Sequence, residues 1–265
     1  MPRANEIGYW GPPTSSVDWC ENNYAHSSFV CEWFNTLSSF VIVLVALVGL
    51  GLHWRVLERR FALAFATLAL VGLGSAAFHA TLLFGLQMAD ELPMLYLALV
   101  MVFILINLDA GRPSALARMR WTGLALAAHG VLVTLLCTLT RGPLQFITFH
   151  LSFGSLESYC LYRTFRLYRT SSLPVARNLF RWGMTCYVSA IGVWFIDLRF
   201  CTALNAGLAN VGLPNPQLHA LWHVLVSFGF YALILQIAQE RLDRLGRTPR
   251  LVQSAFGVPA IASST

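Results

Sequence analysis

The residues best suited to chemistry in this sequence are two histidines four positions apart. They are His219 and His223, at the start of a strongly apolar stretch. In an α-helix this spacing places both imidazole rings on one face, and zinc sites use such pairs. An H-x-x-x-H pattern taken alone is more often accidental than metal-binding, so a metal site needs further ligands from elsewhere in the chain.

Three other polar residues stand beside or within apolar stretches. His79 lies near the end of one stretch, Ser75 precedes it by four residues, and Asp90 lies at the start of the next. Ionisable side chains in a membrane helix are expensive to bury and are functional candidates by default. Whether these residues meet depends on the helices that carry them.

The composition indicates a membrane protein. Of the 265 residues, 57% are hydrophobic and 11% are charged, whereas about a quarter of an ordinary soluble domain is charged. Apolar stretches of about 20 residues, enough to cross a bilayer, recur along the chain. The formal charge of +6 does not indicate a nucleic-acid partner, because the arginines lie in the short segments between apolar stretches.

The expected fold is an all-α bundle of seven transmembrane helices with a zinc site inside the membrane. The spans are expected at residues 33–52, 61–84, 91–108, 121–139, 144–162, 179–198 and 218–238. The fifth is the weakest because it contains Glu157. An N-terminal arm (1–32) precedes the membrane domain (33–240), and a polar tail (241–265) is expected to be disordered.

The arginines give an expected orientation. Arg3, Arg141 and Arg199 would share the side of the N-terminal arm, and all other arginines would lie on the opposite side. By the positive-inside rule that opposite side is cytosolic. We therefore expect a multi-pass protein with a lumenal or extracytoplasmic N-terminus and a cytosolic C-terminus. If the source is a eukaryote, the expected membrane is that of the endoplasmic reticulum or Golgi.

Helix parity brings the candidate residues together. The second helix ends on the arm side, where the third and seventh helices begin, so His79, Asp90, His219 and His223 lie at similar depth. Three histidine ligands leave a fourth zinc position open, which is typical of catalytic zinc rather than structural zinc.

Simpler roles exist for most of these residues. Asp90 would also suit a cap of the third helix, and Ser75 would also suit helix packing. His150 lies about two turns below the arm end of the fifth helix and is a pocket or second-layer candidate. His53 is expected at the membrane interface, and His26 is expected to be solvated.

The arm carries oxygen-bearing side chains in close sequence. Asp18, Glu21 and Asn23 are followed by Glu32 at the start of the first helix. Carboxylate and amide oxygens suit a hard cation such as Ca²⁺. The spacing is not that of an EF-hand, and a solvated acidic arm is the alternative.

The cysteines add a test of the orientation. Cys20 in the arm and Cys201 after the sixth helix fall on the same, oxidising side, where a disulfide between them can form. Cys31 and Cys137 also come near that side, so other pairings stay open.

Several blocks together resemble the alkaline ceramidases, part of a superfamily that also holds the adiponectin and progestin receptors. The blocks are Gly8-Tyr9-Trp10-Gly11-Pro12, Asp18-Trp19-Cys20-Glu21, Asn35-Thr36, Gly74-Ser75, Phe78-His79, Asp90-Glu91-Leu92-Pro93-Met94 and His219-Ala220-Leu221-Trp222-His223. One departure is Glu32-Trp33-Phe34, where family members usually have the aromatic pair reversed. The glutamate is kept, so the departure puts little in doubt.

The resemblance implies a zinc amidase that cleaves ceramide, a lipid substrate within the membrane, to sphingosine and a fatty acid. The implied zinc ligands are His79, His219 and His223. The implied calcium ligands are Asp18, the Trp19 carbonyl, Glu21, Asn23 and Glu32, and the implied disulfide joins Cys20 to Cys201. In that chemistry Asp90 takes the proton of the attacking water and delivers it to the leaving amine, and Ser75 donates a hydrogen bond to the oxyanion.

Two other functions share many of these features. A seven-helix lipid receptor with structural zinc would not need the Asp90 and Ser75 pair. An ester-cleaving hydrolase of the same superfamily, acting in lipid remodelling, would use the same zinc residues, and the Asp18 to Asn23 arm favours a ceramidase over it. Chain-length preference and oligomeric state do not follow from these patterns.

Overall fold

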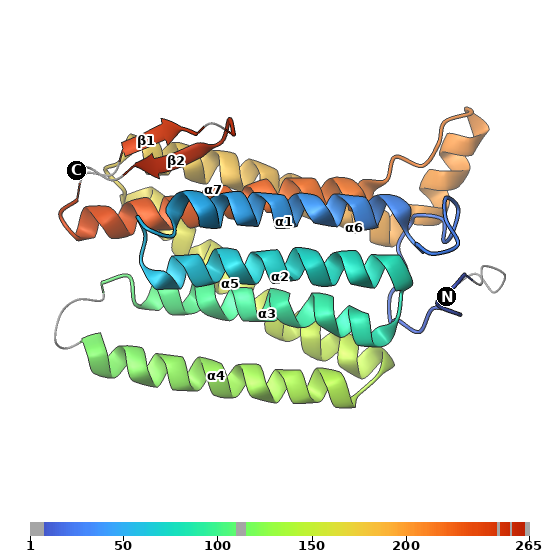
Figure 1. Ribbon diagram of the computed structural model, residues 1–265, viewed down its shortest axis with the longest axis horizontal. Helices are drawn as coiled ribbons and strands as arrows, with labels where there is room; N and C mark the ends of the chain where they lie inside the picture. The colour runs from blue at the N-terminus through green and yellow to red at the C-terminus, as the bar shows by residue number, and fades with distance from the viewer. Residues whose placement is uncertain (1–7, 110–114, 248–249, 255, 263–265) are drawn as a thin grey trace.

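A computed structural model describes residues 8–109, 115–247, 250–254 and 256–262 as a helical bundle with a small β-hairpin (Figure 1). The helices are α1 (Trp33–His53), α2 (Arg59–Thr81), α3 (Phe84–Ile106), α4 (Ala115–Leu139), α5 (Gly142–Thr170), α6 (Pro174–Asn210) and α7 (Leu218–Arg244). The strands are β1 (Arg250–Gln253) and β2 (Pro259–Ala262). We call the end of the bundle that carries residues 8–32 the arm end, and the opposite end the tail end.

All seven predicted helices are present in the described part of the chain, and six of them are long and apolar enough to cross a membrane. The exception is α5, the helix that contains Glu157. Leucines on the outer faces of the other helices, such as Leu44, Leu63 and Leu70, are exposed by half or more. A soluble protein seldom exposes contiguous apolar faces of this kind, whereas lipid chains would cover them.

The predicted boundary between the second and third helices is wrong. Instead of ending at 84 and resuming at 91, the chain turns at Leu82, whose φ of 50° is left-handed, and α3 begins at Phe84. The charged pair Asp90-Glu91 therefore lies inside α3. Because Asp90 is well past the first turn, the alternative that it caps this helix is also wrong.

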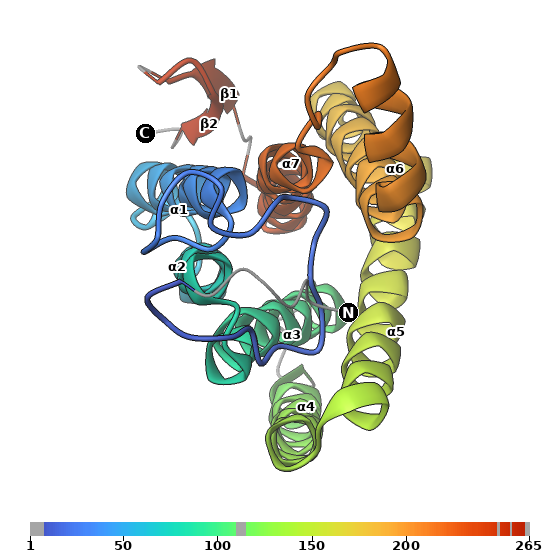
Figure 2. The same ribbon diagram turned by 90° about the vertical axis from the view of Figure 1, so that its right-hand side faces the viewer.

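The helices surround an interior space between α3, α5, α6 and α7. Viewed from the arm end, α2 lies between α1 and α3, and α7 lies between α1 and α6 (Figure 2). The arm crosses the ends of the helices in the same view. At the arm end the last turns of α6 bend away from the bundle axis (Figure 1). The arm is thus placed to cover any site at this end.

Backbone contact joins α2 to α3 beside two candidate residues. Pro93 lies inside α3 and has no N–H, so the Ala89 carbonyl lacks the usual donor four residues later. Gly74 of α2 packs against this carbonyl, and a Cβ at Gly74 would come within 1.8 Å of the Ala89 oxygen. This close approach fixes the level of α2 against α3 next to Ser75 and Asp90, which directly follow the two contacting residues in sequence.

We expect Gly74→Ala to destabilise the protein, although alanine is the better helix former. The contacting atoms are backbone, so α2 and α3 must separate, and overpacking of this kind typically costs about 1–3 kcal/mol. Thermal unfolding in lipid nanodiscs would measure the loss. Gly192→Ala is the matched control, since a Cβ at that helical glycine meets nothing within 4 Å. Equal melting temperatures for the two variants would contradict the packing role.

The prediction of a disordered tail is wrong for its described residues. Helix α7 continues to Arg244, and β1 pairs antiparallel with β2. Ile261 is buried, and its N–H donates to Nε2 of His53 at 3.1 Å. His53, in the last turn of α1, is therefore buried under the hairpin, which the all-α expectation did not include. Residues 1–7 of the arm, with Arg3, and residues 248–249, 255 and 263–265 of the tail lie outside the described residues.

Candidate metal centre and cavity

Three buried histidines converge at the arm end. His79 comes from the last turn of α2, and His219 and His223 come from the first turns of α7. One ring nitrogen of each lies within 4.8 Å of the others. Among the described residues, no other group of three or more His, Cys, Asp or Glu side chains has this geometry.

Two of the rings are oriented by neighbouring side chains. Nδ1 of His79 bonds to Oε2 of Glu32 at 2.5 Å, and Nδ1 of His223 bonds to Oγ of Ser38 at 2.8 Å. Metal-binding histidines almost always use their second nitrogen in this way. The other nitrogen of each ring is left to bind a ligand.

His219 shows that the cluster fits a metal. Its Nδ1 is buried and has no hydrogen-bond partner in the described part of the structure, a situation that is costly for a polar atom unless it binds something else. The Trp19 ring of the arm stacks on the His219 ring with a centroid distance of 3.7 Å. Three imidazoles with ligand atoms facing a common point are a donor set that suits Zn²⁺.

Ser75 lies beside the histidine cluster. Its Oγ is 3.3 Å from Nε2 of His223 and 2.9 Å from Oγ of Ser39. The Ser39 hydroxyl lies 2.7 Å from the Asn35 carbonyl, to which it donates. Because Ser39 has one proton and donates it to Asn35, its oxygen is the acceptor toward Ser75, and this contact fixes the Ser75 hydroxyl beside the cluster with its proton toward Ser39.

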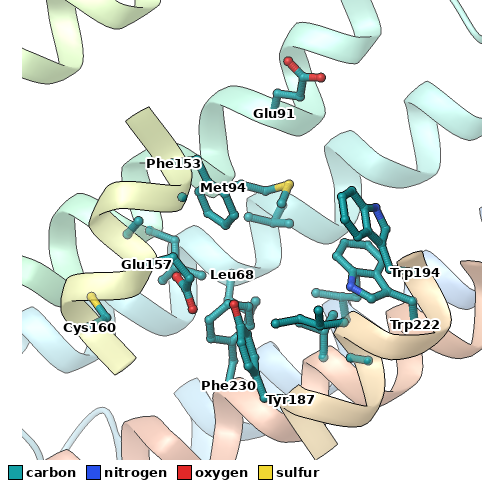
Figure 3. A pocket seen from close by; sticks show the side chains of 18 of the residues that line it. Leu68, Glu91, Met94, Phe153, Glu157, Cys160, Tyr187, Trp194, Trp222 and Phe230 are labelled. Carbon is teal, nitrogen blue, oxygen red and sulfur yellow. The ribbon is translucent and has the colours of Figure 1, made fainter. Parts of the chain in front are cut away.

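An apolar cavity of about 370 Å³ begins at the cluster and continues between α3, α5, α6 and α7. His219 and the partly buried Asp90 both line it. His150 lines it as well, which confirms the pocket prediction, with Nδ1 bonded to the Phe146 carbonyl at 2.8 Å. Figure 3 shows part of the wall, including Trp194 and Trp222. Such a cavity suits long apolar chains.

The oxygen-bearing residues of the arm pack at the start of α1. Both carboxylate oxygens of Glu21 accept α1 backbone N–H groups, at 2.7 and 2.9 Å. Asn23 donates to Asp18 at 3.3 Å, and its Oδ1 is buried without a hydrogen-bond partner in the described structure. Glu32 is fully buried, and its Oε1 accepts the Trp19 N–H at 3.2 Å.

The carboxylates of the arm repel one another. Burial raises the pKa of Glu32 well above its usual range, and the Asp18 carboxylate raises it further. Burial also raises the pKa of Glu21, to which the charge of Glu32 adds. A cation would relieve this repulsion, and the unpartnered Asn23 oxygen is a suitable ligand atom. The cluster therefore fits Ca²⁺.

A disulfide joins Cys20 to Cys201, whose Cα atoms are 5.3 Å apart. It ties the arm to α6. Cys31 and Cys137 are not disulfide-bonded, so the other pairings that the sequence left open are excluded.

Sequence reasoning missed three contacts that hold the arm at this end of the bundle. They are the Glu32 bond to His79, the Trp19 stack on His219, and the bond from the Cys20 backbone N–H to Asp197 of α6 at 3.1 Å. Asp197 could have been noticed as an acid inside an apolar span. The two others join residues that are far apart in sequence and carried no signal of their own.

Comparison with known proteins gives a consistent result. A family model described as Ceramidase matches residues 11–262. Alkaline ceramidase 3 of Mus musculus is 32% identical over 98% of this chain and 96% of its own length. Alkaline ceramidase of Arabidopsis thaliana is 30% identical over 92% and 90%. Alkaline ceramidase YPC1 of Saccharomyces cerevisiae is 28% identical over 92% and 82%.

Proposed function

The chain belongs to the ceramidase family, and from this premise we propose that it hydrolyses the amide bond of ceramide to give sphingosine and a free fatty acid. The observation that carries the proposal is the buried histidine cluster at the head of a long apolar cavity. A lipid amide placed with its chains in the cavity would present its carbonyl to the histidines and Ser75.

Zinc is the metal that the proposal assigns to His79, His219 and His223; when bound, it would activate water for attack and polarise the amide carbonyl. Glu32 and Ser38 hold two of the rings through their Nδ1 atoms. Trp19 covers the third, which helps to exclude bulk water from the site.

Two side chains of the proposal act on the reacting atoms. Asp90 accepts a proton from the attacking water as the new C–O bond forms, and delivers it to the nitrogen as the C–N bond breaks. Ser75 turns its hydroxyl proton from Ser39 to the carbonyl oxygen as negative charge develops there. The position of Ser75 beside His223 and the presence of Asp90 in the cavity wall support these roles.

We propose further that Ca²⁺, held by Asp18, the Trp19 carbonyl, Glu21, Asn23 and Glu32, regulates the site. Glu32 supports this coupling because it contacts both the arm and a histidine of the cluster. Neutralising the arm carboxylates would hold Glu32 in place for His79. Regulation would then act through one shared side chain.

Chelating calcium with a zinc-sparing reagent should lower turnover of the wild-type protein and its melting temperature. Glu32→Gln should do more, because it also removes the carboxylate from His79, and loss of such a partner typically weakens metal affinity by about 10- to 100-fold. Glu21→Gln is the comparison, since Glu21 bonds to α1 and not to a histidine. It should lose the calcium response and keep zinc. Equal zinc affinity in the two variants would contradict the coupling.

The disulfide and the arginines also support an orientation. We propose that the arm end faces the lumen or the cell exterior, where disulfides persist, and that α5 completes seven crossings so that the tail end is cytosolic. Modification of single introduced cysteines by an impermeant reagent in intact vesicles would test both statements.

The direct test of function is a lipid panel. Purified protein in nanodiscs should release fatty acid and sphingosine from ceramides, followed by mass spectrometry, and should leave matched lysolipid esters intact. Release from the esters alone would overturn the proposal in favour of an ester-cleaving hydrolase.

A further inference from the structure

A polar pair interrupts the apolar wall of the cavity far from the histidines. Glu157 of α5 and Tyr187 of α6 point toward each other in Figure 3. Both are buried, with 8% and 6% of their surface exposed, and both line the cavity. Hydrolysis as proposed above uses neither of them.

The depth of Tyr187 can be read from its contact with α7. A Cβ placed on Gly229 would lie 3.4 Å from the backbone nitrogen of Tyr187, so these two residues are level. Gly229 lies six residues after His223, a rise of about 9 Å along the helix.

The level of Glu157 follows from a second contact. Gln236 of α7 donates to the Thr164 carbonyl of α5 at 3.1 Å. Glu157 and Gly229 each precede their partner in this bond by seven residues, which places Glu157 level with Gly229 as well. The pair thus lies about 9 Å below His223, so a chain whose amide sits at the histidines would reach it several methylene groups beyond the amide.

The chemistry of the two side chains decides which ligand group fits there. The oxygens of the Glu157 carboxylate are acceptors, and the Tyr187 hydroxyl is both a donor and an acceptor. A chain of methylene groups offers these polar atoms no hydrogen-bond partner, which is unfavourable in an apolar cavity. A hydroxyl on the chain supplies a donor for the carboxylate and an acceptor for the Tyr187 hydroxyl.

We propose that Glu157 and Tyr187 bind a hydroxyl group in the middle of a lipid chain, and that the enzyme therefore favours ceramides hydroxylated at mid-chain. The inference rests on the proposed ceramide hydrolysis for its substrate, while the binding site itself stands on the geometry of the pair. One added hydrogen bond predicts a preference of about five- to tenfold.

A competition assay tests the preference. The purified protein in nanodiscs receives an equal mixture of four ceramides: unsubstituted, and hydroxylated near the amide, at mid-chain or near the chain end. Mass spectrometry of the released chains gives the ratio of kcat/KM values. The mid-chain ceramide should be favoured over all three others. Equal ratios, or a preference for another position, would overturn the proposal.

Two variants separate recognition from a structural role. Tyr187→Phe and Glu157→Leu should bring the mid-chain preference down to about one, because either change removes a polar partner of the ligand hydroxyl. Thr185→Ala is the matched control. It removes an exposed hydroxyl from the same helix, bonded to the Arg181 carbonyl outside the cavity, and should keep the wild-type ratio. A pair that merely tethers α5 to α6 would lower turnover of all four ceramides alike and leave the ratio unchanged.

A binding measurement distinguishes failure of this inference from failure of the proposed function. A mid-chain hydroxylated fatty acid should raise the melting temperature of the wild-type protein more than the unsubstituted acid does, and Tyr187→Phe should abolish the difference. If no ceramide is hydrolysed but this difference appears, the binding site stands and the proposed function fails. If ceramides are hydrolysed and neither the ratio nor the melting temperature responds to the hydroxyl, the inference fails alone.

Discussion

Replacing His79, His219 or His223 by alanine should reduce ceramide hydrolysis to the assay background and lower the bound zinc from about one ion per chain. With two imidazoles left, the site keeps too few ligands to hold the ion that activates water and polarises the carbonyl. Zinc content by mass spectrometry and turnover by lipidomics, on the same preparations, would measure both losses.

His26→Ala is the control for these variants, because His26 is an exposed residue of the arm. It should keep both zinc and turnover. Stoichiometric zinc together with full activity in any one of the three cluster variants would exclude that residue as a ligand. Loss of zinc from all three with activity retained would exclude a catalytic metal.

The number of helices and the members of the histidine cluster followed from the sequence because apolar length and helix parity fix depth. His79 and His219 are far apart in the chain, yet both stand at helix ends on one side. Parity does not depend on where each helix begins, so the error at the start of α3 left the convergence intact.

Residue-level contacts could not be predicted in the same way. The Glu32 bond to His79 depends on how the arm packs over α1, and no periodic pattern encodes that packing. The sequence does suggest Glu32 as a calcium ligand, but it does not show that the same carboxylate contacts a histidine. The boundary at Leu82 was missed for a related reason, since a left-handed leucine between two apolar stretches has no polar or glycine signal.

Variants of Asp90 and Ser75 should keep zinc and lose turnover, whereas variants of the three histidines should lose both. Asp90→Asn should keep zinc and lose about 10²- to 10⁴-fold in kcat, because an amide cannot accept the proton of water. Glu91→Gln is the comparison on the same helix: its carboxylate accepts amide protons from Gln87 and Gln145, so it should lose far less.

Ser75→Ala should also keep zinc while losing about 10²- to 10³-fold in kcat, the usual effect of removing one oxyanion donor.

Its neighbour Ser39 offers a test of how that donor is held. Ser39 accepts from Ser75 while donating to Asn35, so Ser39→Ala should let the Ser75 hydroxyl rotate and lower kcat by a smaller factor. The measurement is single-turnover hydrolysis with zinc content checked on each variant.

Wild-type turnover in both Asp90→Asn and Ser75→Ala would leave Asp90 as a wall residue of the cavity and Ser75 as a packing residue of α2. Reduced turnover explained entirely by lost zinc would instead place Ser75 among the residues that orient His223.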